Sequence, residues 1–166
     1  MIATLKFLHI GTMLAWCASL VALPVLLSAY GQSWRHPHAA AGQAQARFAE
    51  FRLITHYGYI GFATPAAILA IASGTALIFA AGVFDLWFAA KLALVCGMVL
   101  VHTWIGDMIL TSGEKRGRAW LPWPLTALSI GIALMAAVLW LVLAKPDLRF
   151  LTGWMPGFML SPWGQG

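Results

Sequence analysis

Charged residues are scarce in this 166-residue chain, in which Asp, Glu, Lys and Arg together make up 9% of the composition. A soluble globular domain carries about 25% charged residues. So few charges cannot solvate the surface of a globule of this size, which excludes a water-soluble enzyme, a disordered chain and a nucleic-acid-binding domain. We interpret the net charge of +5 as loop charge of a membrane protein, and we expect no nucleic-acid partner.

Cysteine is also rare, since only Cys17 and Cys96 are present and both lie within apolar runs. A lone thiol in such a run usually packs as a small apolar group, so we expect neither a disulfide framework nor a cysteine metal site. The sequence also lacks a glycine-rich phosphate loop, a Cys-x-x-Cys-His motif for covalent haem attachment and a His-Glu-x-x-His zinc motif.

Four apolar runs are long enough to cross a bilayer, which takes about 20 residues in a helix. They cover residues 2–30, 53–81, 86–110 and 121–143. No stretch alternates between polar and apolar residues over the length of a transmembrane strand. The sequence therefore predicts an all-α integral membrane four-helix bundle, with residues 1–166 in a single domain.

Two loops set the expected orientation, because residues 31–52 and 111–120 each contain three Lys or Arg residues. The positive-inside rule places both loops in the cytoplasm and both termini outside. We expect a multi-pass protein of the bacterial inner (cytoplasmic) membrane, in contact with lipid, whose tail 146–166 lies at the outer surface.

Four polar residues stand out within the apolar runs: His9, His56, Lys91 and His102. A charged group at mid-depth costs on the order of 2.5–3.5 kcal/mol, so such groups usually face the bundle interior and have partners. Lys91 and His102 are 11 residues apart, about 20° past three full turns, so they share a helix face at a separation of roughly 16 Å. From their depths, we predict one pair of His9 with Lys91 toward the outside and one of His56 with His102 toward the inside.

Histidines on different helices of a four-helix bundle are the usual ligands of a b-type haem. Apolar walls exclude water from the macrocycle, and a nearby lysine or arginine pairs with a haem propionate. The candidate cofactor-binding residues are His9, His56, His102, Lys91, Met13 and Met98, of which the three histidines are the candidate iron ligands.

The same residues have structural interpretations that the sequence leaves open. A histidine can hydrogen-bond to a neighbouring helix, which contributes about 0.6 kcal/mol on average. Lys91 can extend its ammonium group to the membrane interface. The Thr64–Pro65 step interrupts the second run, because proline removes a helix hydrogen bond and kinks the helix. A kink there would open space beside His56 or His102.

Several segments resemble the HemJ-type protoporphyrinogen oxidases, a family of small four-helix bacterial membrane proteins. The similar segments are Lys-Phe-Leu-His at 6–9, Leu-Pro at 23–24, Thr-Pro-Ala-Ala-Ile-Leu at 64–69, Ala-Lys-Leu-Ala-Leu-Val at 90–95 and Ala-Lys-Pro at 144–146, together with Trp16 and His102. They touch all four apolar runs in the family's order.

The resemblance implies a haem b protein that oxidises protoporphyrinogen IX to protoporphyrin IX and passes electrons to quinone. It implies His9 as a haem ligand and Lys91 as the essential lysine of the third helix, here taken as catalytic. The chain departs from the family at three charged positions, where it has Val25, the pair Thr55–His56 and the stretch 121–124.

Other functions stay open at this point. The missing charges favour a non-catalytic haem-binding subunit of a larger respiratory or dehydrogenase membrane complex. A copper transport protein resembling the CopD family would use methionine and histidine, because thioethers suit Cu(I), although no Met-x-x-Met or His-Met cluster is present. A structural membrane protein without a cofactor is the simplest alternative. The expected partners are a porphyrin or a quinone, and either a second copy of the chain or other membrane subunits.

Overall fold

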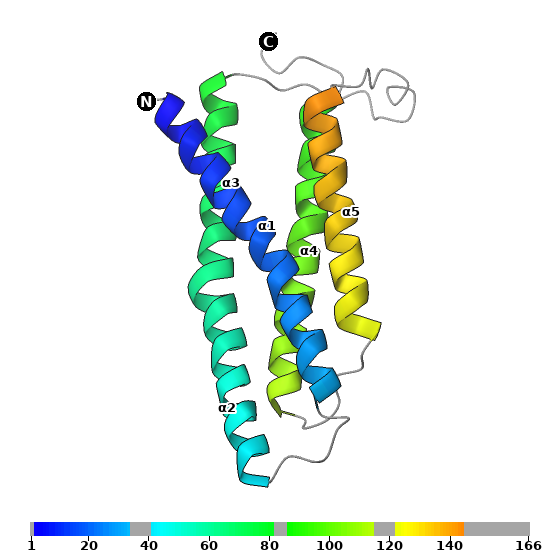
Figure 1. The fold of residues 1–166 in the computed structure, drawn as a ribbon. Helices are drawn as coiled ribbons and strands as arrows, with labels where there is room; N and C mark the ends of the chain where they lie inside the picture. The colour runs from blue at the N-terminus through cyan, green and yellow to red at the C-terminus, as the bar shows by residue number, and fades with distance from the viewer. Residues whose placement is uncertain (1, 34–40, 82–85, 115–121, 145–166) are drawn as a thin grey trace.

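The computed structural model describes residues 2–33, 41–81, 86–114 and 122–144, and within these ranges the chain is entirely helical (Figure 1). Side chains are described for 2–29, 49–80, 87–111 and 124–144. The elements are α1 (Ile2–Ser33), α2 (Ala41–Tyr57), η1 (Gly58–Ala63), α3 (Thr64–Ala81), α4 (Leu86–Glu114) and α5 (Pro122–Ala144).

Four helices of the described ranges are long and apolar enough to cross a membrane: Ile2–Ala29, Ala49–Ala80, Trp87–Thr111 and Pro124–Ala144. The prediction of an all-α membrane four-helix bundle is thus confirmed. Many large apolar side chains point outward from the bundle, including Phe7, Leu100 and Leu143, which are 81%, 70% and 74% exposed. In a multi-pass membrane protein such a surface faces lipid.

The second spanning helix is longer than predicted, because α2 begins at Ala41 rather than near residue 53. Its first residues are polar, and α2 projects beyond the ends of the neighbouring helices (Figure 1). The membrane-crossing part begins at Ala49. The tail predicted for residues 146–166 lies outside the described residues.

The chain passes Pro65 as a continuous helix, because the six residues of η1 form π-helical turns directly before it. The backbone N–H of Thr64 donates to the carbonyl of Tyr59, five residues earlier. The Thr64 hydroxyl donates to the same carbonyl at 2.9 Å. Such wider turns shift the carbonyl with which a proline ring clashes in a regular α-helix, and they often mark functional sites.

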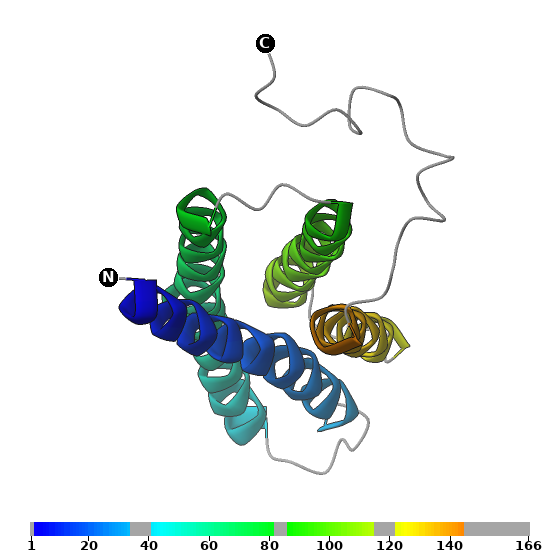
Figure 2. The same cartoon turned by 90° about the horizontal axis from the view of Figure 1, so that it is seen from above.

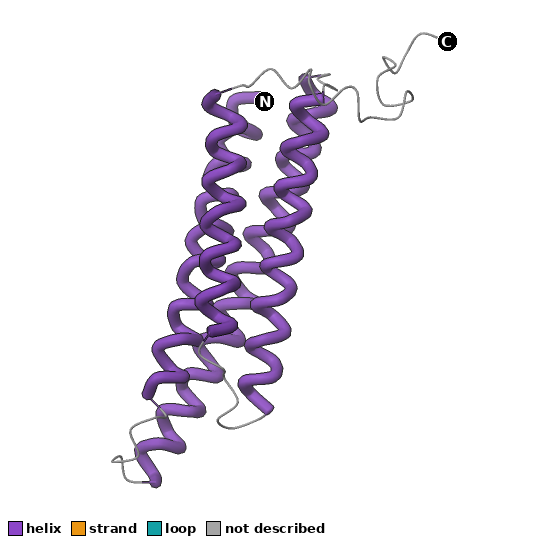
Figure 3. Tube along the Cα trace, turned by 90° about the vertical axis from the view of Figure 1, so that its right-hand side faces the viewer, coloured by secondary structure: helices purple, strands orange, loops and turns teal. Residues whose placement is uncertain are grey.

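Two helix pairs dominate the packing, since α1 packs most extensively on α3, and α4 packs on α5. Seen from above, α1 runs obliquely across the bundle and also reaches α5 (Figure 2). Toward the end that carries the N-terminus the helices separate into two groups (Figure 3). The buried core lies deeper in the bundle and includes Trp16, Leu20, Leu27, Ala63, Met98 and Ile105.

Candidate functional site

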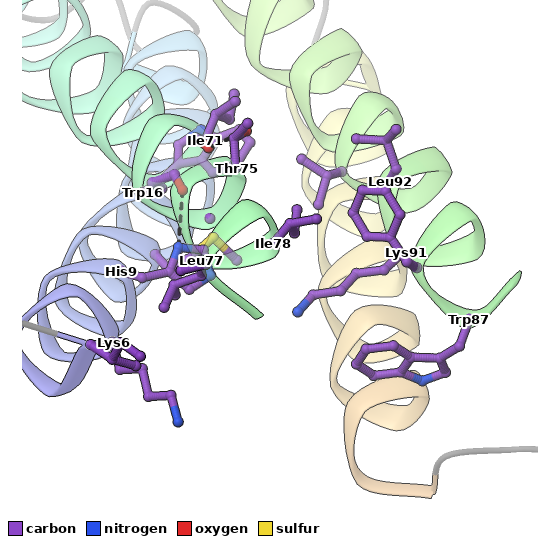
Figure 4. Close-up of a pocket in the computed structure, with 17 residues that line it drawn as sticks. Lys6, His9, Trp16, Ile71, Thr75, Leu77, Ile78, Trp87, Lys91 and Leu92 are labelled. Atoms are coloured by element: carbon purple, nitrogen blue, oxygen red, sulfur yellow. Dashed lines mark hydrogen bonds between the residues drawn. The ribbon is translucent and has the colours of Figure 1, made fainter. Parts of the chain in front are cut away.

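A cavity of about 570 Å³ lies between α1, α3 and α4, in the half of the bundle that carries the N-terminus (Figure 4). On α1 its lining residues run from Ile2 to Trp16, a distance of about 21 Å along the helix. Clefts of roughly 300–1,000 Å³ typically hold cofactors and small ligands. The cavity is therefore large enough for a sizeable cofactor.

The lining of this cavity is mostly apolar and carries positive charge only. Its ionisable side chains are Lys6, His9 and Lys91, and none of its described lining residues is an Asp or Glu. Lys6 lies nearer the N-terminal end of α1 than His9 and is exposed, whereas Lys91 is partly buried. An unpaired ammonium group between apolar walls attracts an anionic group on a ligand, because screening by water is weak there.

His9 is fixed by α3. Its Nδ1 donates to the backbone carbonyl of Ala70 at 2.9 Å and lies 3.3 Å from the Ser73 hydroxyl oxygen. A carbonyl oxygen can only accept, so Nδ1 carries the proton. In a neutral imidazole Nε2 is then unprotonated and able to bind a metal. A backbone carbonyl on the distal nitrogen is the usual support of a metal-binding histidine.

Gly74 makes this position of His9 possible. A Cβ built on Gly74 would lie 2.8 Å from Cε1 of the His9 ring, which is closer than real Cβ contacts. The imidazole therefore needs a glycine beneath it. Ala70 and Gly74 form a small-xxx-small pair, a pattern that lets membrane helices approach closely.

Lys91 lies on the opposite wall, on α4, and its ammonium group extends into the space between α4 and α3 (Figure 4). Its Nζ is 5.4 Å from the centroid of the Trp87 ring, which is within the range of a cation–π contact. The Trp87 indole N–H donates to the carbonyl of Leu141 on α5 at 2.9 Å. Trp87 thus links the Lys91 side of the cavity to α5.

His102 is buried in the core and is not among the residues that line the cavity. Its ring stacks on Tyr59, with centroids 4.7 Å apart at 19°, and its Nε2 lies 3.4 Å from the Thr64 hydroxyl oxygen. The Tyr59 hydroxyl donates to the His102 carbonyl at 3.3 Å. Gly106 leaves room for Tyr59, since a Cβ at Gly106 would collide with the phenol oxygen.

The structure thus brings His9 and Lys91 to one cavity and does not bring His56 to His102. His56 is exposed, and its ring contacts that of its neighbour Tyr57. Among the methionines, Met13 lines the cavity one helical turn from His9, whereas Met98 is fully buried in the core.

Sequence reasoning missed the residues that hold His9 and Lys91 in place. In the sequence, Ala70 and Gly74 are two small residues in an apolar run. Their spacing of four residues was the one pattern that could have indicated close packing of this helix against another. Trp87 resembled an interfacial anchor at a helix end. Its bond to Leu141 depends on which helices are neighbours, which one sequence does not state.

Within the described residues, no group of three or more His, Cys, Asp or Glu side chains is placed to hold a metal ion. A haem needs no such cluster, because the porphyrin itself supplies four ligands and the protein adds one or two. Comparisons of this chain with models of known families, with curated proteins and with solved structures give no match. The chemistry of the cavity is thus the basis for a functional proposal.

Proposed function

We propose that this chain is a membrane redox protein that binds haem b in the cavity between α1, α3 and α4. One observation carries the proposal: His9 is held through Nδ1 by the Ala70 carbonyl, inside an apolar cavity whose far wall presents the Lys91 ammonium group. This is how proteins prepare an imidazole to bind iron through Nε2.

The side chains that line the cavity fit haem b. The apolar walls suit the faces of the macrocycle, and Lys91 and Lys6 are the cations available to pair with its propionates. Bound haem would supply a reversible one-electron centre. His9 is the one histidine among the described lining residues, so the proposal assigns one histidine ligand to each haem. Met13 follows His9 by one turn on the same face of α1, so it packs beside the ligand rather than opposite it.

The proposed reaction is the oxidation of protoporphyrinogen IX, which the resemblance to the HemJ-type family implies. A porphyrinogen, like haem, carries two propionates on an apolar ring system, so it suits the apolar rim and the exposed Lys6 of a cavity that holds haem. In this proposal Lys91 pairs with a haem propionate, and His9 holds the redox centre beside which the substrate binds.

Quinone is the proposed electron acceptor. Ile71 and Leu92 line the cavity from α3 and α4 and are 40% and 50% exposed. A lipid-soluble acceptor therefore has apolar contacts at the boundary of the site. The bacterial inner membrane, with both termini outside, is the proposed location, since the basic loops would then be cytoplasmic.

An absorption spectrum of the purified protein after dithionite reduction tests the cofactor. The proposal expects a b-type spectrum and about one haem per chain, whereas a haem-free protein from haem-replete cells contradicts it. Growth of a protoporphyrinogen-oxidase-deficient bacterium tests the reaction. Rescue by the wild-type chain and loss of rescue in Lys91→Ala support the enzyme. Haem binding without rescue would instead favour an electron-carrying subunit of a larger complex.

A further inference from the structure

Helix α5 contributes none of the described side chains that line the cavity, yet one hydrogen bond connects it to them. The indole N–H of Trp87, the second residue of α4, donates to the backbone carbonyl of Leu141 at 2.9 Å, and Trp87 lines the cavity. Leu141 lies in the last turn of α5, where the carbonyl groups form the negative end of the helix dipole and attract a donor. A side chain of the cavity is therefore held from outside the cavity.

The face of the same indole lies beneath the charge of Lys91. Nζ of Lys91 is 5.4 Å from the centroid of the Trp87 ring. The two residues are four apart on α4, so they lie one turn apart on one face of the helix. The negative face of an aromatic ring attracts a cation. None of the described lining residues is an Asp or Glu, so no carboxylate of that lining competes with a ligand for this ammonium group.

The anchored ring restrains a flexible side chain. Lysine has a four-carbon stem and can extend its ammonium group toward the membrane interface. The edge of the Trp87 ring is fixed by its hydrogen bond to α5, and its face contacts the ammonium group of Lys91. The ammonium group is thereby kept in the space between α4 and α3 (Figure 4).

We propose that Trp87 is the positioning residue of the site: anchored to α5, it holds the Lys91 ammonium group where an anionic group of the ligand binds. The inference rests on the proposed function for the identity of that group, a haem propionate, and it makes α5 part of the site. Because Trp87 acts through Lys91, its loss should matter only while Lys91 is present and only for a ligand with free carboxylates.

Haem titration of purified apoprotein variants tests this dependence. Trp87→Leu should raise the dissociation constant about 2- to 30-fold, the range that corresponds to one cation–π contact. In a Lys91→Met background the same substitution should have almost no further effect, whereas a purely structural role would weaken binding in both backgrounds alike. Haem dimethyl ester, whose propionates are esterified, should bind equally well to the wild type and to Trp87→Leu.

Two further variants keep the test decisive. Trp140→Leu is the matched control and should bind haem like the wild type, because Trp140 is 59% exposed on α5 and is not among the described lining residues. Trp87→Phe serves if Trp87→Leu does not fold. Phenylalanine keeps a ring face but has no N–H for the Leu141 carbonyl, so a smaller loss of affinity is expected, and it should also vanish in the Lys91→Met background.

Nuclear magnetic resonance of the haem-free full chain in lipid bilayers separates this inference from the haem proposal. The ring current of Trp87 should shift the ε-methylene protons of Lys91 upfield, and the shift should disappear in Trp87→Leu and persist in Trp140→Leu. If the chain binds no haem, the proposed function fails and this shift alone decides the inference. An unshifted Lys91 signal in the wild type would overturn it, as would equal losses of haem affinity from Trp87→Leu with and without Lys91.

Discussion

The imidazole of His9 occupies the space that a side chain at position 74 would fill. A Cβ on Gly74 would lie 2.8 Å from Cε1 of His9, and the same close approach of α1 to α3 brings Nδ1 within 2.9 Å of the Ala70 carbonyl. The position of the proposed iron ligand therefore depends on a residue that would never touch the cofactor.

Gly74→Ala should weaken haem binding. The added methyl group forces the His9 ring away from α3, so its hydrogen bond to Ala70 is lost or lengthened. Loss of such a supporting bond usually costs 10- to 100-fold in metal affinity, and the overpacked interface should lose about 1–3 kcal/mol of stability. Haem titration of the purified apoprotein measures the first effect.

Gly11→Ala is the matched control for Gly74→Ala. A Cβ on Gly11 meets nothing within 4 Å, so haem affinity should stay at the wild-type value. Equal losses of haem affinity in Gly74→Ala and Gly11→Ala would show that the close contact between His9 and Gly74 does not determine haem affinity.

Lys91→Met should lower haem affinity without unfolding the protein. Methionine keeps the apolar part of the side chain and removes the ammonium group that would pair with a propionate. A hydrogen bond to a charged group contributes about 1.5–3 kcal/mol, so the dissociation constant should rise roughly 10- to 100-fold. Lys91→Arg should retain most of the affinity, because the charge is kept. Wild-type affinity in Lys91→Met would exclude the proposed ion pair.

Gly106→Ala should destabilise the bundle at mid-depth. The new methyl group would collide with the Tyr59 phenol, which stacks on His102 and donates to its carbonyl. Overpacking of this kind costs about 1–3 kcal/mol. Thermal unfolding in detergent measures the change. Gly61→Ala should be close to neutral, because a Cβ there lies in open space. If Gly106→Ala also unfolds at the wild-type temperature, the close Tyr59–Gly106 contact is not present.

The helices that cross the membrane could be predicted because bilayer thickness sets their minimum length and excludes charge from them. Their ends agree within a few residues except at α2, whose early turns are polar and carry no hydropathy signal. The distances of His9 and Lys91 from their helix starts placed both residues near one end of the bundle. Both residues line the cavity.

Rotation about the helix axis could not be predicted in the same way. His56 and His102 were paired by depth alone, but His56 is exposed and His102 is buried beside Tyr59. The sequence predicted a kink at Pro65 but did not predict the π-helical turns before it. A kink and π-helical turns are both compatible with a proline, and the choice depends on the bonds that Thr64 makes to Tyr59.

The most direct test of the central claim compares reduced absorption spectra of the wild-type chain with those of His9→Ala and His56→Ala, purified from the same haem-replete cells. His9 lines the cavity, whereas His56 is exposed elsewhere on the bundle. The account predicts a b-type spectrum in the wild type and in His56→Ala, and loss of at least nine-tenths of the bound haem, about a tenfold effect, in His9→Ala. An unchanged haem spectrum in His9→Ala would contradict it.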